Sequence, residues 1–169
     1  MIQDQAFCVY RSPIGTIVLR ASDRGLTRLD FVDETDEIVN AQGSANDEYL
    51  KTAVSQLDEY FAGSRTCFDV PLDLRGTPFQ MAAWRALLLI PCGATCSYGM
   101  LASRIGRPKA VRAVGGANHQ NPIAVIVPCH RVIGSDGKLT GYGGGLWRKE
   151  WLLGHEKKMA TKGNEIKHD

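Results

Sequence analysis

The sequence lacks any apolar run long enough to cross a membrane. Its first residues, MIQDQAFCVY, contain no basic segment followed by an apolar core, so we expect no signal peptide and no membrane partner. Five cysteines, an odd number at irregular spacing, do not form a disulfide framework. Internal repeats are also absent. These absences favour a cytoplasmic protein, because the cytosol keeps thiols reduced.

The charge that is present is divided unevenly along the chain. The net charge of +2 and the 44% hydrophobic content are ordinary for a globular protein. Residues 1–75, however, carry a net charge of −6, and residues 76–169 carry +8. A basic half suggests contact with a polyanion such as nucleic acid. Solvated surface lysines are the alternative, which charge alone does not exclude.

The first half predicts a small antiparallel sheet and one helix. Three short β-rich runs are separated by the turn sequences SPI and SDR. In DEYLKTAVSQLDEYFAG the apolar residues recur at helical spacing, with Asp47 as the N-cap and Gly63 as the stop. The expected strands are Ala6–Arg11, Gly15–Ala21 and Gly25–Val32, and the expected apolar helical face is Leu50, Val54, Leu57 and Phe61.

The second half predicts helices. Thr77, Pro78 and Gln80 have the spacing of a capping box with proline at the first helical position. Ser97 can cap a second helix to about Ile105, and a tight turn at Gly-Arg-Pro leads to a third at 109–118. This arrangement has the spacing of a helix-turn-helix. A core αα-hairpin fits the spacing equally well.

The chain after these helices contains the features that suggest chemistry. Ile123–Val127 is a continuous apolar run, which predicts a buried extended segment that Pro128 ends. A last helix is expected at Leu146–His155, followed by a flexible polar tail at 157–169. We therefore predict an N-terminal α/β domain at 1–75 and a C-terminal domain at 76–169.

Cys129 differs from the other cysteines because it ends a buried run and can lie at the floor of a pocket. A thiolate needs a cationic or proton-accepting neighbour. His130 is adjacent, but neighbours in extended chain point to opposite faces, so a bend or a bridging water is required. Glu156 is a candidate to orient the imidazole, and His155 could face the core. The pattern indicates a Cys–His–acid site without naming its electrophile.

The other cysteines are read differently. Cys8 and Cys67 are expected to be small buried hydrophobes. Cys92 and Cys96 have a spacing that could hold a metal, but no second ligand pair lies nearby in the sequence.

The second half resembles a known family. The segment from GTPFQMAAW to IVPCHRVIG, followed by TGYGGGLWRKEWLLGHE, is similar to the O6-alkylguanine-DNA alkyltransferases, also called methylated-DNA–protein-cysteine methyltransferases, in their bacterial form. The likeness is strong from about Gly76 to Glu156 and weaker before it. It implies an α+β fold with a ribonuclease-H-like N-terminal sheet domain. The C-terminal helical domain would carry a winged-helix-like helix-turn-helix.

The resemblance also implies a role for each matching residue. Cys129 would accept the alkyl group from O6 of guanine, and the carbonyls of Cys129 and Val132 would read the guanine edge. His130 would take the thiol proton through a water, oriented by Glu156. Asn121 would tie the recognition helix to the active-site segment, and Tyr98 would help guanine leave by hydrogen bonding N3.

The same resemblance assigns the DNA contacts and the pocket. Arg112 would fill the gap left by an extruded nucleotide. The remaining DNA-contacting positions would be Lys109, Ala110, Val111, Ala113, Gly115 and Gly116. The pocket would be lined by Tyr142, Val132, Gly143 and Ala124.

Three departures from the family pattern concern the pocket and the N-terminal domain. Gly143 stands where some members have serine, so a hydroxyl contact to O6 is lost. Ala124 stands where some have a second proline, which changes the pocket wall. The four histidines all lie beyond residue 118, so the metal ligands of some N-terminal domains have no evident set here.

The sequence thus predicts stoichiometric repair of double-stranded DNA containing O6-alkylguanine. We expect a monomer that needs no cofactor and no metal, while cooperation between copies on DNA and repair of O4-alkylthymine stay open. The main alternative is a lesion-binding protein of the same fold that performs no chemistry. A sequence-specific transcription regulator and a cysteine hydrolase are further alternatives.

Overall fold

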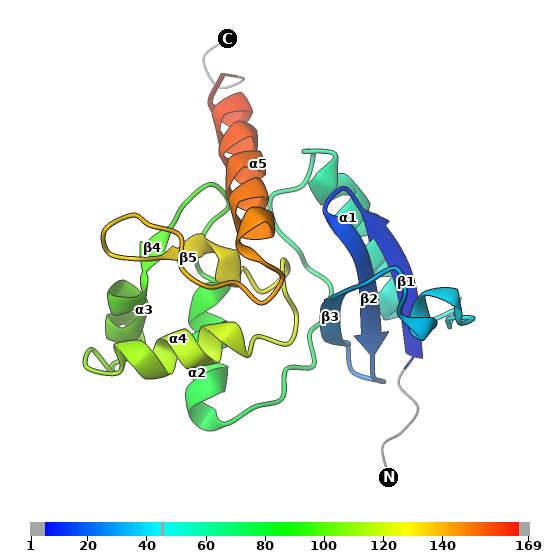
Figure 1. Cartoon of the computed structure of the whole chain (residues 1–169), viewed down its shortest axis with the longest axis horizontal. Helices are drawn as coiled ribbons and strands as arrows, with labels where there is room; N and C mark the ends of the chain where they lie inside the picture. Colours follow the sequence, from blue (N-terminus) through cyan, green and yellow to red (C-terminus); the bar gives the residue numbers. More distant parts are fainter. Residues whose placement is uncertain (1–5, 45, 166–169) are drawn as a thin grey trace. The chain divides into compact units, whose positions relative to one another are not determined.

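The computed structural model describes residues 6–44 and 46–165, which form two compact units. The first unit runs to Arg75 and also includes Pro122–Ala124. The second contains Gly76–Asn121 and the chain from Val125 onward. The first unit is a sheet with one long helix and the second is mainly helical, which confirms the predicted α+β class (Figure 1).

The sheet of the first unit is an antiparallel meander of β1 (Ala6–Ser12), β2 (Gly15–Ala21) and β3 (Leu26–Val32). Its central strand β2 supplies Ile17 and Leu19, which are fully buried. Gly25, with φ +153°, lies against the chain at Pro71, where a Cβ would collide with the proline carbonyl. That glycine is required because β3 begins beside this extended segment.

The helix of the first unit, α1 (Glu48–Phe61), begins as predicted at Asp47, whose side chain accepts a hydrogen bond from the Leu50 amide. Its buried face is shifted slightly from the prediction. Leu50 and Leu57 are buried, but the other core positions are Ala53, Gln56 and Tyr60. A short 3-10 helix, η1 (Glu37–Asn40), lies in the acidic stretch between β3 and α1.

The second unit is built on three helices. They are α2 (Pro78–Leu87), α3 (Tyr98–Arg104) and α4 (Val111–His119). Thr77 and Gln80 form the predicted capping box, and the Ser97 side chain caps α3. Gly106, with φ +73°, makes the turn between α3 and α4. Trp84 on α2 donates to the carbonyl of Ala117 on α4 at 2.8 Å, which fixes these two helices.

Three short elements and one long helix complete the second unit. A two-stranded parallel sheet joins β4 (Cys96–Ser97) to β5 (Val132–Ile133), directly after the 3-10 helix η2 (Cys129–Arg131). The last helix, α5, runs from Leu146 to Glu165 instead of ending at His155. Met159 is buried and Ala160 packs beside Gly93, so this extension has contacts with the protein.

The predicted extended segment at Ile123–Val127 is wrong. Only Ile123 forms a bridge, with Leu29, and the following residues turn. Val125 has φ 71°, an unfavourable backbone conformation for a β-branched residue, yet its side chain is buried. The Asn121 side chain donates to the Val127 carbonyl at 2.7 Å and closes this turn. Apolar periodicity could not distinguish a buried turn from a buried strand.

None of the helices among residues 6–44 and 46–165 combines the length and the apolar character needed to cross a bilayer.

Candidate active site

Cys129 begins the single 3-10 turn of η2, after Pro128. The turn replaces the extended chain that we expected at this position, so the opposite-face argument for Cys129 and His130 does not apply. The amide of Cys129 donates to the Val127 carbonyl at 2.8 Å, and the residue is only 5% exposed. The thiol is therefore fixed on a buried backbone turn.

His130 and Glu156 meet within this unit. Nε2 of His130 lies 2.7 Å from Oε1 of Glu156, and both residues are 0% exposed. Burial alone would raise the pKa of Glu156, but hydrogen bonds and charge from His130 and Arg131 outweigh it and hold this pKa well below its usual range. A carboxylate only accepts, so Nε2 must carry the proton. Nδ1 of His130 then carries the lone pair, and it has no hydrogen-bond partner among the described residues.

Arg131 is the first functional side chain that sequence reasoning missed. It donates from Nε to Oε2 of Glu156 and from Nη2 to Oε1, both at 2.9 Å, and from Nη1 to the Ile90 carbonyl at 2.5 Å. Only the position of Arg131 directly after His130 could have drawn attention to it.

The electrostatics of Cys129 combine opposing effects. Burial raises the pKa of the thiol, whereas a hydrogen bond from the Asn121 side chain and the positive charge of Lys149 lower it. Burial dominates, so the resting thiol is protonated at neutral pH. A proton acceptor is therefore needed to form the thiolate, and Nδ1 of His130 carries a lone pair.

Lys149 is the second side chain that the sequence did not reveal. It is 0% exposed, and its Nζ donates to the Thr140 carbonyl at 2.8 Å. Burial lowers its pKa, and the negative charge of an ionised Cys129 raises it in part. The same ammonium lies 5.9 Å from the centre of the Tyr98 ring. Lys149 thus supplies positive charge beside the thiol and anchors the loop at Thr140.

That loop, residues 134–145, carries two of the predicted pocket residues. The hydroxyl of Tyr142 is buried without a hydrogen-bond partner among the described residues, and burial raises its pKa well above the usual value. A Cβ added at Gly143 would meet nothing within 4 Å, so the structure has room for a side chain at this position. Arg148 donates to the Gly144 carbonyl at 2.6 Å and fixes the end of the loop.

Two asparagines connect α4 to the active-site turn. Asn121 contacts the Val127 carbonyl and the thiol of Cys129. Asn118, which the sequence analysis did not single out, donates from Nδ2 to the Cys129 carbonyl at 3.2 Å. This carbonyl also accepts the Val132 amide. A contact with guanine at this carbonyl would therefore be its third hydrogen bond.

The outward side of α4 has little side-chain bulk. Arg112 and Gly116 are exposed, and no atom lies within 4 Å of a Cβ built at Gly116. A Cβ at Gly115 would meet only the Tyr98 ring, at 4.0 Å. The packing of the unit therefore does not require these two glycines. Among the other predicted contact positions, Lys109, Val111 and Ala113 are exposed and Ala110 is half-buried.

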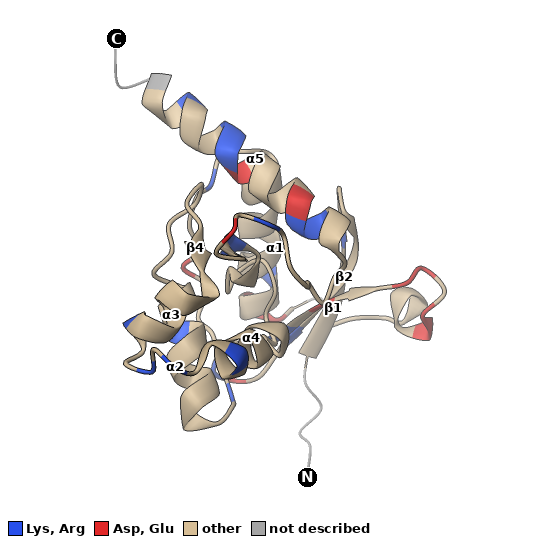
Figure 2. Cartoon of the chain, turned by 60° about the vertical axis from the view of Figure 1, so that its left-hand side comes forward, with Lys and Arg blue, Asp and Glu red and all other residues tan. Residues whose placement is uncertain are grey.

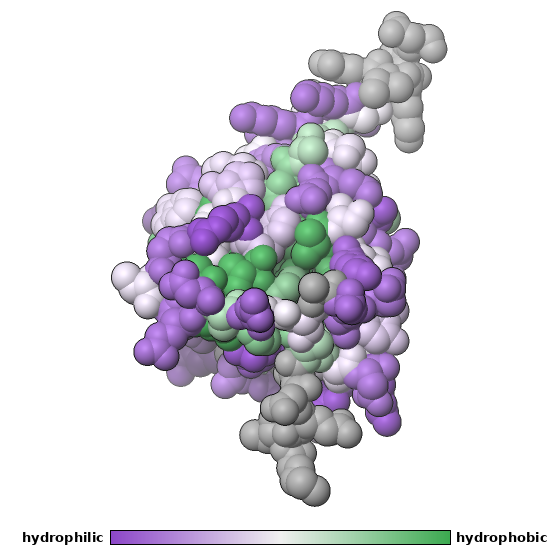
Figure 3. All heavy atoms as spheres, turned by 90° about the vertical axis from the view of Figure 1, so that its right-hand side faces the viewer, coloured by the Kyte–Doolittle hydropathy of each residue, from purple (hydrophilic) through white to green (hydrophobic). Residues whose placement is uncertain are grey.

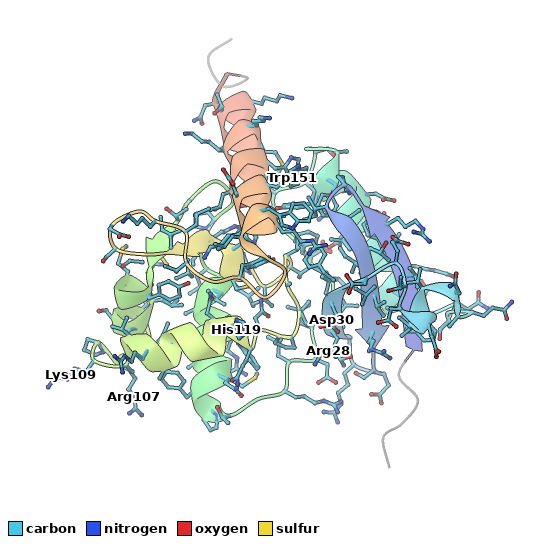
Figure 4. All side chains as sticks on the ribbon, in the orientation of Figure 1. Arg28, Asp30, Arg107, Lys109, His119 and Trp151 are labelled. Carbon is cyan, nitrogen blue, oxygen red and sulfur yellow. The ribbon has the colours of Figure 1, made fainter. Side chains whose placement is uncertain are left out.

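Basic side chains cluster around the same helices. Arg107 and Lys109 project outward from the turn before α4 (Figure 4). Arg104 on α3 and Arg112 on α4 are also exposed, and Figure 2 shows blue segments on α3, on α4 and on the turn between them. In the first unit the segment around η1 is instead acidic (Figure 2). The helix-turn-helix thus carries part of the positive charge predicted for the second half, and α5 carries another part.

Tyr98 begins α3, and its hydroxyl accepts a hydrogen bond from Thr140 Oγ1 at 2.9 Å. Because the tyrosine oxygen is the acceptor here, its own proton can be donated elsewhere. Val132 lies in β5, directly after η2, and is fully buried. Ala124 belongs to the first unit, so its role in the pocket stays a prediction.

A cavity in the first unit contains a different thiol. Its volume is about 360 Å³, and Cys8, Leu50 and Val54 are among its lining residues. Figure 3 shows one face of the molecule, on which apolar side chains gather between polar ones. Burial and the charge of Asp47 raise the pKa of Cys8 to about 11, so this thiol stays protonated.

The remaining cysteines lie in different surroundings. Cys96 is buried in β4, where burial raises its pKa and the charge of Arg104 lowers it in part. Cys67 is exposed, so the prediction that it is a buried hydrophobe was wrong. Within the described part of the chain, no three His, Cys, Asp or Glu side chains are placed to share a metal ion.

The fold and the site together define a two-unit α+β protein with a buried Cys–His–Glu cluster beside a basic helix-turn-helix. Family models match both parts. Residues 7–74 match the ribonuclease-like domain of 6-O-methylguanine DNA methyltransferase, and residues 78–158 match its DNA binding domain. The chain belongs to the methylated-DNA–protein-cysteine methyltransferase family.

Individual relatives agree with this assignment. The methylated-DNA–protein-cysteine methyltransferase of Mycolicibacterium paratuberculosis is 55% identical over 149 residues, which cover 88% of this chain and 90% of the relative. That of Methanosarcina acetivorans is 50% identical over 148 residues, covering 87% and 95%. The crystal structure of Mycobacterium tuberculosis O6-methylguanine methyltransferase is 52% identical, with a TM-score of 0.81 and coverage of 92% and 94%. A second structure of that protein is a complex with DNA, also with a TM-score of 0.81 and 52% identity, covering 90% of this chain and 93% of that one.

Proposed function

We propose that this chain transfers an alkyl group from O6 of guanine in double-stranded DNA to the thiol of Cys129. One observation carries the proposal: a buried thiol shares a turn with a histidine whose proton is fixed on Nε2 by Glu156. A protein that only binds lesions has no use for this cluster. The names of the relatives support the same reaction.

The reaction begins with proton transfer. The proton of Cys129 passes, through a water, to Nδ1 of His130, and the imidazolium that forms is stabilised by Glu156. The thiolate attacks the alkyl carbon while the bond from that carbon to O6 breaks. Guanine leaves with the electron pair of that bond. Tyr98 donates a hydrogen bond to N3 of guanine, which makes the base a better leaving group.

The product is a thioether on Cys129. A base and a water do not cleave an unactivated carbon–sulfur bond, so each molecule acts once. The reaction needs no cofactor, since the thiol itself is consumed. We expect the protein to act as a monomer in the cytoplasm.

The substrate must leave the duplex to reach a buried thiol. Rotating a nucleotide out of the helix costs about a few kcal/mol. The exposed Arg104, Arg107 and Lys109 offset that cost by contacting phosphates, and Arg112 fills the gap in the stack. The outer face of α4 at Gly115 and Gly116 has little side-chain bulk, which suits the minor groove of DNA. In that groove the base pairs show a degenerate pattern of donors and acceptors. Such binding fits a repair protein that meets lesions in any sequence.

Gly116→Ala separates folding from DNA binding. The methyl group meets no protein atom, and alanine is favoured over glycine in a helix by about 1 kcal/mol, so the free energy of unfolding should rise. Binding to duplex DNA should weaken by roughly tenfold, or about 1.4 kcal/mol, because the methyl group enters the groove. Thermal unfolding and titration of a labelled duplex measure the two effects.

Gly154→Ala is the matched control for this substitution. Gly154 is exposed on α5, and its added Cβ also meets nothing. The control should gain similar stability and leave DNA affinity unchanged. Equal affinity in both variants would show that the α4 face does not approach DNA.

The proposal is tested by measuring how many lesions each protein molecule removes. A fixed amount of protein is mixed with increasing amounts of duplex containing O6-methylguanine, and the remaining lesion is measured after complete reaction. Removal should stop at one lesion per protein molecule. Intact lesion at every ratio would instead identify a non-catalytic lesion binder, and continued removal would identify a turnover enzyme.

A further inference from the structure

The active-site cluster contains a buried charge to which the proposed mechanism assigns no role. Arg131 is 6% exposed and belongs to the same 3-10 turn as Cys129 and His130. Burying a guanidinium is costly unless all its donors are satisfied. Nε and Nη2 contact Glu156, and Nη1 contacts the Ile90 carbonyl. Two of the nitrogens of the Arg131 guanidinium thus donate to a single carboxylate, that of Glu156.

The fork determines how Glu156 is held. Nε of Arg131 bonds Oε2 and Nη2 bonds Oε1, so the guanidinium engages both carboxylate oxygens. Oε1 is also the atom that contacts Nε2 of His130. Glu156 therefore cannot rotate away from the imidazole without losing bonds to Arg131. Arg131 therefore aligns the carboxylate of Glu156 on α5 with the imidazole of His130 in η2.

We propose that Arg131 is a positioning residue that acts through Glu156 to keep His130 neutral, with its proton on Nε2 and its lone pair on Nδ1. This inference rests on the proposed function, in which Nδ1 receives the proton of Cys129. Arg131 touches neither the alkyl group nor the thiol in that reaction. Its guanidinium keeps Glu156 ionised, and an ionised Glu156 can only accept the Nε2 proton.

The charge of Arg131 has a second effect on His130. The charged groups that act on the imidazole are Glu156 and Lys149 from α5, and Arg131 from its own turn. Burial lowers the pKa of His130, Glu156 raises it in part, and the positive charges of Arg131 and Lys149 lower it further. A histidine that is already an imidazolium cannot take the thiol proton. Arg131 therefore extends the pH range in which the base is available.

Nitrogen NMR of the free protein tests this directly. With 15N-labelled histidine, the ring shifts of His130 report which nitrogen is protonated and at what pH the second proton binds. The wild-type protein should show the proton on Nε2. In Arg131→Gln the two tautomers should mix and the second protonation should move to higher pH.

Two further variants control the measurement. Arg131→Lys keeps the charge but cannot engage both oxygens in a planar fork, so the tautomers should mix with a smaller shift in pH. It also provides a test if Arg131→Gln does not fold. Arg65→Gln removes an arginine that pairs with Glu59 in the first unit, and it should leave His130 unchanged.

Rates of alkyl transfer separate positioning from simple stability. The single-turnover rate in Arg131→Gln should fall by roughly tenfold or more. A positioned base contributes about a hundredfold or more to the rate, and the variant loses part of that contribution. The acidic limb of its pH–rate profile should move to higher pH. Loss of stability alone would lower the yield of active protein without moving that limb.

Two results would overturn the inference. One is an unchanged His130 tautomer and protonation pH in a folded Arg131 variant, and the other is an unmoved acidic limb. Failure of the proposed function would look different. The wild-type protein would then transfer no alkyl group, while NMR could still show the tautomer set by Arg131.

Discussion

Replacement of Cys129 by serine should abolish alkyl transfer while DNA binding stays within about twofold, because a serine hydroxyl is a far weaker acid and nucleophile than a thiol. The substitution changes one buried atom, and the backbone bonds of Cys129 to Val127 and Asn118 do not involve it. The rate is measured by the disappearance of O6-methylguanine from a labelled duplex. Affinity is measured on the same duplex.

Cys8→Ser is the matched control. Cys8 is half-buried in the first unit, and its raised pKa makes it a poor nucleophile. This variant should remove one lesion per molecule, as the wild-type protein does. Dealkylation that survives in Cys129→Ser and is lost in Cys8→Ser would show that Cys8, and not Cys129, accepts the alkyl group.

Replacement of Glu156 by glutamine should have the second largest effect. The neutral amide can donate to Nε2 of His130, so the fixed tautomer is lost, and the alkyl-transfer rate should fall by about a hundredfold or more. The guanidinium of Arg131 would also lose its charged partner. Removing one member of a buried ion pair costs about 3–5 kcal/mol in the free energy of unfolding.

This loss of stability should depend on pH. The pKa of Glu156 lies below its unfolded value of 4.5, so ionised Glu156 stabilises the fold at every pH above that value. The stabilisation disappears as pH falls from 4.5 toward the folded pKa. The difference in unfolding free energy between wild type and Glu156→Gln should therefore be constant near neutral pH and shrink in acid.

Glu59→Gln provides the comparison for an exposed pair. Glu59 binds Arg65 at 2.8 Å, but nearly half of its side chain is exposed. Its loss should cost less than about 1 kcal/mol and leave the alkyl-transfer rate unchanged. Equal costs for Glu59→Gln and Glu156→Gln in denaturant titrations would show that the Glu156 cluster is not a buried ion pair.

The local signals in the sequence predicted where helices begin. Asp47, Thr77 and Ser97 cap α1, α2 and α3 with side-chain bonds to backbone amides. These signals work because a helix start leaves amides unpaired, and only a few side chains can reach them. The start of α4 shows the limit, because its N-cap position, Ala110, makes no side-chain bond and the helix begins later than expected.

Long-range partners could not be predicted in the same way. The sequence analysis did not single out Arg131 and Lys149, yet both are buried by contacts with distant residues. The turn at Val125 was hidden because a buried strand and a buried turn share the same apolar composition. The residue pattern already indicated Cys129, His130 and Glu156, and the resemblance to a family assigned their roles. The structure added the contact between Nε2 of His130 and Glu156, and because a carboxylate only accepts, this contact determines the tautomer.

Alkyl transfer to Cys129 is tested most directly by the mass of one peptide. The protein is mixed with an equal amount of duplex containing O6-methylguanine and then digested, and the peptide holding Cys129 is measured. We expect the mass gain of one methylene on that peptide, located on the sulfur of Cys129 by fragmentation. An unmodified Cys129 after the lesion has disappeared, or a methyl group on another residue, would contradict it.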